Sequence, residues 1–361
     1  MKKEFVSDRQ CIILIFLFLV GESAIFVRGG KAEQDLWIAV LVALIMTFPM
    51  AMIYARLHCY IFMGKDIFDL IEFCFGKLVG KIIILLFAFY TFELSSAVTI
   101  NASQFIITTS FPETPEIMIT IMLIILSAWI LRSGLEVFSR WGGLFGLIAF
   151  TVLIGSILLL IPDTNIDNIF PILNNGVNPI IKGAFGAFAY AFAEIIIFIM
   201  VFSKFESKKS PYKVYFLGLL IGGILVFMIS FMNILVLGSN TAGSFYFATH
   251  SSFRRIDAGK YFQRIEVLIA TVFMIGVFVK ISITYLATCK CIAKVFGFKD
   301  YKFIIIPIGL LLINLSVFLH ENIFEYFEFG EEVYPYYAFP FQVILPIIIL
   351  ITAKMKMRKV K

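Results

Sequence analysis

The sequence has little charge and few histidines. Only 15% of its 361 residues are Asp, Glu, Lys or Arg, and three are histidines. A soluble domain carries about 25% charged residues, whereas 61% of this chain is hydrophobic. One aqueous core cannot hold so much apolar surface. The composition therefore excludes an ordinary soluble protein and predicts one membrane domain over residues 1–361.

The short motifs of common enzymes are also missing. The sequence has no Walker A lysine loop, no HExxH and no GxSxG, and His58, His250 and His320 lie in separate segments. Cys289 and Cys291 are too close for a CxxC site and have no neighbouring cluster of ligands. We expect no enzymatic activity, no cofactor and no metal site.

Ten apolar segments are long enough to cross the membrane. A bilayer core of about 30 Å needs about 20 mostly apolar residues per helix. The spans are predicted at 9–27, 36–57, 81–108, 116–131, 141–161, 182–202, 212–237, 264–289, 302–319 and 339–354. A short amphipathic helix is expected at 67–74, an interfacial helix within the basic loop 238–263, and a solvated acidic loop before the last span. The pattern predicts an all-α integral membrane protein with ten transmembrane helices.

The positions of lysine and arginine predict the orientation. If the N-terminus lies inside, 22 of the 30 Lys and Arg residues fall on the cytoplasmic side. The positive-inside rule then places both termini in the cytoplasm. The net charge of +6 is explained by this asymmetry, and no nucleic-acid partner is expected.

The spans divide into two groups of five with opposite orientations. Residues 1–162 and 163–361 then form two inverted repeats, and polar breaks occur in the matching first and sixth spans. Span one is interrupted by Gly21, Glu22 and Ser23. Span six carries Gly183, Gly186, Tyr190 and Glu194. Broken helices at these positions favour a midplane ligand site, while close helix packing is the alternative explanation of the glycines.

Four ionisable residues lie well inside the predicted spans: Glu22, Glu93, Glu194 and Lys280. Each must face the bundle interior, a partner charge or water, because a charge facing lipid is costly. Glu93 and Lys280 occupy matching places in the two repeats, so that a salt bridge between them and a proton-responsive or ion-gating role are both open. The neutral side chains of Ser96, Thr99 and Thr284 can add hydrogen bonds toward a central cavity, or bond back to their own helix.

Several strings of residues resemble one family across nearly the whole chain, and in the family's order. They are Gln34-Asp35-Leu36-Trp37-Ile38, Gly76-Lys77-Leu78-Val79-Gly80-Lys81, Pro112-Glu113-Thr114-Pro115, Arg132-Ser133-Gly134-Leu135-Glu136-Val137, Asn168-Ile169-Phe170-Pro171-Ile172-Leu173 and Arg264-Ile265-Glu266. The chain resembles the B subunits of endospore germinant receptors, of the spore germination permease family. Ala193 precedes Glu194, where that family often has glycine.

The resemblance implies the LeuT-like 5+5 inverted-repeat fold of the APC superfamily, with broken helices 1 and 6. It also implies a protein of the spore inner membrane that binds a small nutrient, such as an amino acid, sugar or nucleoside. Its expected partners are the larger A subunit and the lipid-anchored C subunit of the receptor. Fold alone does not decide between sensing and transport.

Three functions remain open at this point: a germinant sensor, a proton-coupled amino acid permease, and a ligand-gated ion channel within the receptor complex. The apolar and aromatic surroundings favour a small or hydrophobic amino acid and leave a sugar or nucleoside open. The candidate ligand-binding residues are Gly21, Glu22, Ser23, Glu93, Ser96, Thr99, Gly186, Tyr190, Glu194, Lys280 and Thr284.

Overall fold

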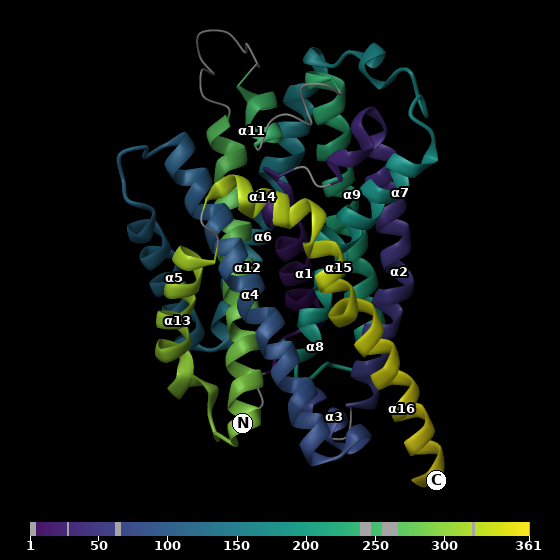
Figure 1. Ribbon diagram of the computed structural model, residues 1–361, viewed down its shortest axis with the longest axis vertical. Coiled ribbons are helices and arrows are strands. Elements are labelled where there is room, and N and C mark those ends of the chain that lie inside the picture. Colours follow the sequence, from purple (N-terminus) through teal and green to yellow (C-terminus); the bar gives the residue numbers. More distant parts are fainter. Residues whose placement is uncertain are drawn as a thin grey trace.

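The computed structural model describes residues 5–26, 29–61, 66–238, 247–254, 266–319 and 322–360. Within these ranges all regular structure is helical, as predicted. The long helices run side by side along the longest axis of the molecule (Figure 1). Large apolar side chains such as Trp129 and Leu147 are 71% and 66% exposed on the outside, which is expected of a surface that faces lipid.

Nine helices of the described chain are long and apolar enough to cross a membrane. The shorter helix α1 corresponds to the first predicted span and brings the number of spans to ten. The spans are α1 (Asp8–Ser23), α2 (Leu36–Tyr60), α4 (Lys77–Thr109), α5 (Glu116–Ser133), α6 (Leu135–Leu160), the composite span six from α7 (Val177–Ala187) to α8 (Phe198–Val201), α9 (Ser210–Leu237), α12 (Glu266–Phe296), α13 (Ile305–Phe318) and the composite span ten from α15 (Tyr334–Phe339) to α16 (Leu345–Val360).

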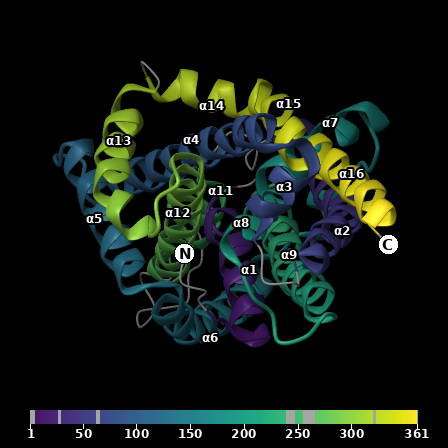
Figure 2. The same cartoon turned by 90° about the horizontal axis from the view of Figure 1, so that it is seen from below.

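Helix α1 lies in the middle of the bundle, between α6, α9 and α12 (Figure 2). It is apolar on all sides and buried along most of its length, which is typical of a helix enclosed by others. Glycines on α9 make room for it: a Cβ added to Gly218 would lie 2.7 Å from Ile15, and one added to Gly222 would lie 2.8 Å from Leu19. Small residues spaced by four let membrane helices approach closely.

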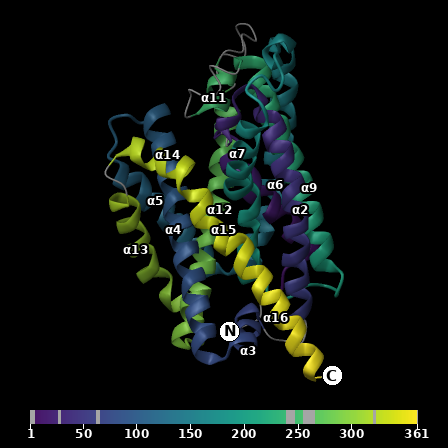
Figure 3. The same cartoon turned by 45° about the vertical axis from the view of Figure 1, so that its right-hand side comes forward.

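Both ends of the described chain lie at the end of the bundle that also holds α3 (Ile67–Phe75), opposite α11 (Ala248–Phe253) and α14 (Ile323–Glu332) (Figure 3). The amphipathic helix predicted at 67–74 is therefore confirmed as α3. Lysines at this end cap the carbonyls that helix C-termini leave unpaired. Lys290 donates to Val201 O at 2.8 Å, and Lys81 donates to Val295 O at 2.7 Å.

Several boundaries differ from the sequence-based prediction. Span ten begins at Tyr334 instead of residue 339, and the acidic segment before it forms helix α14 instead of a loop. Span one ends at Ser23, four residues before the predicted end. In the loop expected at 238–263, α11 is the described helix, and most of the remaining loop lies outside the described residues.

Candidate functional site

Three of the four predicted membrane charges meet at one point. The ammonium of Lys280 on α12 donates to the carboxylate of Glu22 on α1, and its Nζ lies 2.6 Å from Oε2 of Glu194 in span six. Their side chains are 2%, 6% and 0% exposed. Buried charges are tolerated only when paired, so this ion triad ties spans one, six and eight together.

The close approach of α1 and α12 brings Glu22 within reach of Lys280. A Cβ on Gly21 would lie 2.5 Å from the carbonyl carbon of Gly276, so neither position has room for a side chain. Gly21 lies inside α1, which remains helical up to Ser23. The expected interruption of span one therefore takes the form of an early end at Ser23, and Gly21 itself mediates helix packing.

Each carboxylate of the triad has a second hydrogen-bond donor. The side-chain amide of Asn101 on α4 donates to Glu22, and the hydroxyl of Tyr334 on α15 donates to Glu194 Oε1 at 2.7 Å. The ring of Phe18 lies 5.2 Å from the ammonium of Lys280, within the range of a cation–π contact. Sequence reasoning missed Tyr334 because the last span was predicted to begin after it, and Asn101 was not among the predicted ligand-binding residues.

Span six changes helix type just before Glu194. Helix α7 passes into the π-helix η4 (Phe188–Phe192), then into the 3-10 helix η5 (Ala193–Ile197) and α8. Such changes release backbone carbonyls from the helical pattern, and here side chains from other spans supply donors. Gln342 Nε2 donates to Ala189 O at 2.7 Å, and the hydroxyl of Tyr54 donates to Ala193 O at 3.5 Å. The predicted break of span six is thus a change of helix geometry without an unwound turn.

Glu93 does not take part in the triad. The possible salt bridge between Glu93 and Lys280 is wrong, because Lys280 pairs with Glu22 and Glu194 instead. The carboxylate of Glu93 is nevertheless buried, and its Oε2 has no hydrogen-bond partner. Glu93 and Lys280 occupy equivalent positions in the two repeats, but they do not form an ion pair.

The other predicted residues make separate contacts in the bundle. Thr99 and Thr284 donate to carbonyls of their own helices, which is the second of the two possibilities predicted for them. Ser96 forms a hydrogen bond with Ser316 on α13. Ser23 is buried at the end of α1. Gly186 and Tyr190 line a cavity of about 240 Å³ at the end of span six that lies away from α3, between α7 and α14–α15. We call it the α7 cavity.

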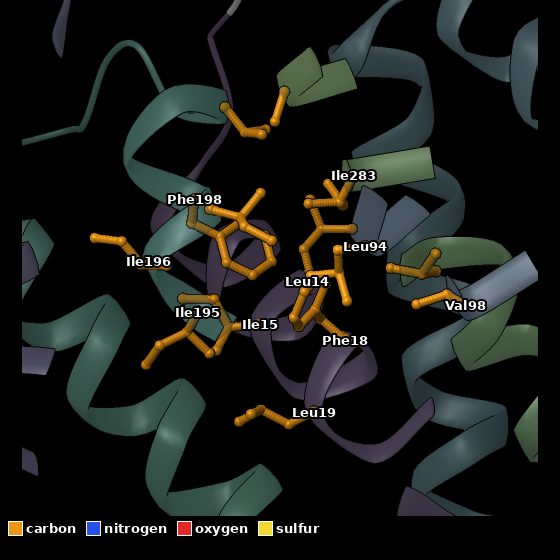
Figure 4. Close-up of a cluster of buried hydrophobic side chains, with 14 of the residues drawn as sticks. Leu14, Ile15, Phe18, Leu19, Leu94, Val98, Ile195, Ile196, Phe198 and Ile283 are labelled. Carbon is orange, nitrogen blue, oxygen red and sulfur yellow. The ribbon is translucent and has the colours of Figure 1, made fainter. Parts of the chain in front are cut away.

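Two barriers separate the triad from the two ends of the bundle. Toward the α7 cavity, the rings of Tyr190 and Tyr334 lie 4.2 Å apart. Toward α3, apolar side chains one or two turns along each helix form a cluster that includes Leu14, Phe18, Phe198 and Ile283 (Figure 4). Beyond this cluster lies a cavity of about 630 Å³ lined by residues of α3, α8 and α12. The triad is therefore closed off from both sides.

The fold is shared with two solved structures, one of which is a transporter. The chain aligns over 95% of its length with Mhp1, a nucleobase-cation-symport-1 family transporter solved in a closed conformation with bromovinylhydantoin bound, at a TM-score of 0.69, 10% identity and 78% coverage of that chain. It aligns over 98% of its length with MhsT in complex with L-phenylalanine, at a TM-score of 0.65, 13% identity and 99% coverage of that chain. These likenesses and the helical spans define a multi-pass membrane protein with a LeuT-like fold.

The sequence comparisons identify the family. A family profile described as spore germination protein matches residues 5–323. Spore germination protein KB of Bacillus subtilis (strain 168) is 27% identical over 365 aligned residues, which cover 99% of this chain and 97% of that protein. The chain belongs to the spore germination protein family, and the predicted resemblance is confirmed.

Proposed function

We propose that this chain is the nutrient-sensing membrane subunit of a spore germination receptor. It binds a small nutrient, such as an amino acid, near the middle of the membrane and signals to partner subunits. The observation that carries the proposal is the closed ion triad, because one buried ammonium connects spans one, six and eight. Family membership and the shared fold support a transporter-like receptor subunit.

A charged group on the nutrient would act through this triad. A ligand shifts a conformational equilibrium only as far as it binds the two states with different affinity. An ammonium or carboxylate that enters beside Lys280 competes with Glu22 or Glu194 for their ion pairs, and so changes how firmly α1 and span six are held to α12. Tyr190 and Tyr334 lie between the triad and the α7 cavity. They form the barrier that a ligand entering from that cavity must pass.

The proposal includes partners and orientation. The chain lies in the spore inner membrane with both termini in the cytoplasm, and it acts with the A and C subunits of the receptor. Four lysines at the end that holds α3 cap helix C-termini, and this cationic end is the one expected to face the cytoplasm. The orientation can be tested with single cysteines introduced at residues 328 and 299 and a membrane-impermeant maleimide. Only the cysteine at residue 328 should react when the reagent is added from outside.

The experiment that tests sensing uses spores in which this chain belongs to the sole germination receptor. A panel of single amino acids, D-glucose and inosine is added, and the loss of refractility is followed over time. At least one nutrient should trigger germination, and deletion of the chain should abolish the response. Spores that respond to the same nutrients without the chain would contradict the proposal.

A secondary transporter is the second candidate, which the fold likeness to Mhp1 and MhsT favours. It predicts counterflow of a labelled amino acid in proteoliposomes that is lost in Glu194→Gln. A nutrient-triggered ion flux through the assembled receptor, without movement of the nutrient, would instead support a channel. If spores germinate through this chain without transport of the nutrient and without an ion flux, sensing is the function that remains.

A further inference from the structure

A second polar cluster lies beside the triad, where α4 meets span ten. Three of its oxygen atoms are buried and have no hydrogen-bond partner: Glu93 Oε2, Gln342 Oε1 and Tyr337 Oη. Glu93 is 7% exposed and Gln342 is 0% exposed. Buried polar atoms are nearly always hydrogen-bonded, so three unsatisfied atoms in one cluster call for a specific explanation.

Contacts through Tyr90 bring these groups together. Tyr90 lies three residues before Glu93, on the same face of α4, and its hydroxyl accepts a hydrogen bond of 3.0 Å from Gln342 Nε2. Its ring stacks on Phe341 at 4.9 Å and lies 6.3 Å from the ring of Tyr337. Glu93 is close enough to Tyr337 and Tyr90 to interact with both electrostatically.

Among the described residues, Glu93 has no ammonium partner at the centre of the bundle, because Lys280 is paired with two other carboxylates. Of the ionisable groups on the spans there, Glu22, Glu93 and Glu194 carry carboxylates and Lys280 carries the ammonium, which is already shared by two of the three. A further carboxylate buried without a cation is costly. What the cluster lacks is therefore several hydrogen-bond donors, and a bound cation that supplies them would also favour the ionised form of Glu93.

We propose that Glu93, Gln342 and Tyr337 form a binding site for the ammonium group of the nutrient, so that the ligand class is a small amine or amino acid and not a neutral sugar or nucleoside. An ammonium group carries three N–H donors and no acceptor, which matches three oxygen atoms that accept. The rings of Tyr90, Tyr337 and Phe341 add cation–π attraction. This inference rests on the proposed function and names the residue that selects its ligand.

An inorganic cation fits this cluster less well. Sodium and similar hard ions need five or more oxygen ligands to replace their water shell, as the cages for calcium and magnesium illustrate. The cluster offers three oxygens, one of them phenolic, enclosed by aromatic rings. An ammonium gains from both the oxygens and the rings.

The test measures binding to the purified full-length chain in lipid nanodiscs. Thermal stabilisation is titrated with each of the twenty L-amino acids, with D-glucose, with inosine and with NaCl, for wild type, Glu93→Gln and Glu116→Gln. Glu116 is a matched control, because its carboxylate at the start of α5 is already satisfied by Ser103 and Gln104. For any amino acid that binds, its N-acetyl derivative is titrated as well.

At least one amino acid should stabilise wild type and Glu116→Gln equally, should bind Glu93→Gln at least tenfold more weakly, and should not bind as the N-acetyl derivative. The ligand-free Tm of Glu93→Gln should equal or exceed that of wild type, because Glu93 Oε2 has no hydrogen-bond partner that the substitution could remove, and this separates a binding role from a structural one. Tyr337→Phe, which keeps the ring, should weaken binding severalfold.

Three results would overturn the inference. They are affinity of Glu93→Gln within twofold of wild type, binding of the N-acetyl derivative, and stabilisation by D-glucose, inosine or NaCl in place of amino acids. If sole-receptor spores germinate with D-glucose or inosine through this chain, the sensing function stands and the ammonium site is wrong. If the spore response does not depend on the chain at all, the proposed function itself fails.

Discussion

Lys280→Met is the most informative single change to the ion triad. It keeps an unbranched side chain of similar length but removes the ammonium that both Glu22 and Glu194 share. Each carboxylate keeps one neutral donor, Asn101 or Tyr334, and neither keeps a cation. Removing one partner of a buried ion pair costs about 3–5 kcal/mol. Because two carboxylates are left unpaired here, we expect a loss near the upper end of that range.

Thermal unfolding of the purified protein in nanodiscs measures this loss as a decrease in Tm. The control is Lys302→Met, whose ammonium caps the carbonyl of Arg132 at an exposed site, where a change of less than about 1 kcal/mol is expected. Combining Lys280→Met with Glu22→Gln and Glu194→Gln should recover most of the stability, since no buried charge remains unpaired. An unchanged Tm in Lys280→Met would refute the reasoning that the ammonium balances buried carboxylates.

Three further predictions follow from particular contacts. Gly21→Val should destabilise the protein by about 1–3 kcal/mol through overpacking against Gly276. The control Gly143→Ala should leave the Tm unchanged or raised, because a Cβ at Gly143 meets nothing within 4 Å. Equal effects of the two substitutions would contradict the close contact between Gly21 and Gly276. Gln342→Leu leaves the Ala189 carbonyl without its side-chain donor and should cost about 1–3 kcal/mol, and a neutral effect in urea unfolding would show that the carbonyl is satisfied otherwise. Burial lowers the pKa of His250 on α11 below 6.5, so the folded state binds this proton less readily than the unfolded state. Helix α11 should therefore become less stable as the pH falls below about 6.5. Hydrogen exchange over 248–253, corrected for intrinsic rates, should increase at low pH in wild type and not in His250→Gln.

Hydropathy predicted the spans because lipid imposes the same requirement on each of them. Ten segments of sufficient length and apolarity were found, and the single charges inside them stood out. The pairing of those charges could not be predicted, because it depends on how each helix is rotated about its axis. Helices as uniformly apolar as α1 give no indication of that rotation, and so Glu93 was considered for a partner that binds Glu22 and Glu194.

Two other features needed the three-dimensional structure. A glycine beside a glutamate in a membrane helix fits a break and a close contact equally well, and the partner of Gly21 is Gly276, far along the chain. Tyr334 belongs to a segment whose tyrosines and acids lower its hydropathy, so the last span was predicted to start after it. Pro335 in the first turn of α15 was the available signal, because proline is common at helix starts.

The central claim is that a nutrient acts at the ion triad to start germination. Tyr334→Phe tests it most directly, because the change removes the hydroxyl that donates to Glu194 and keeps the ring. In sole-receptor spores, with equal amounts of protein confirmed by immunoblot, the germination dose response to the activating nutrient should shift at least severalfold in concentration. A dose response that superimposes on that of wild type would contradict the account.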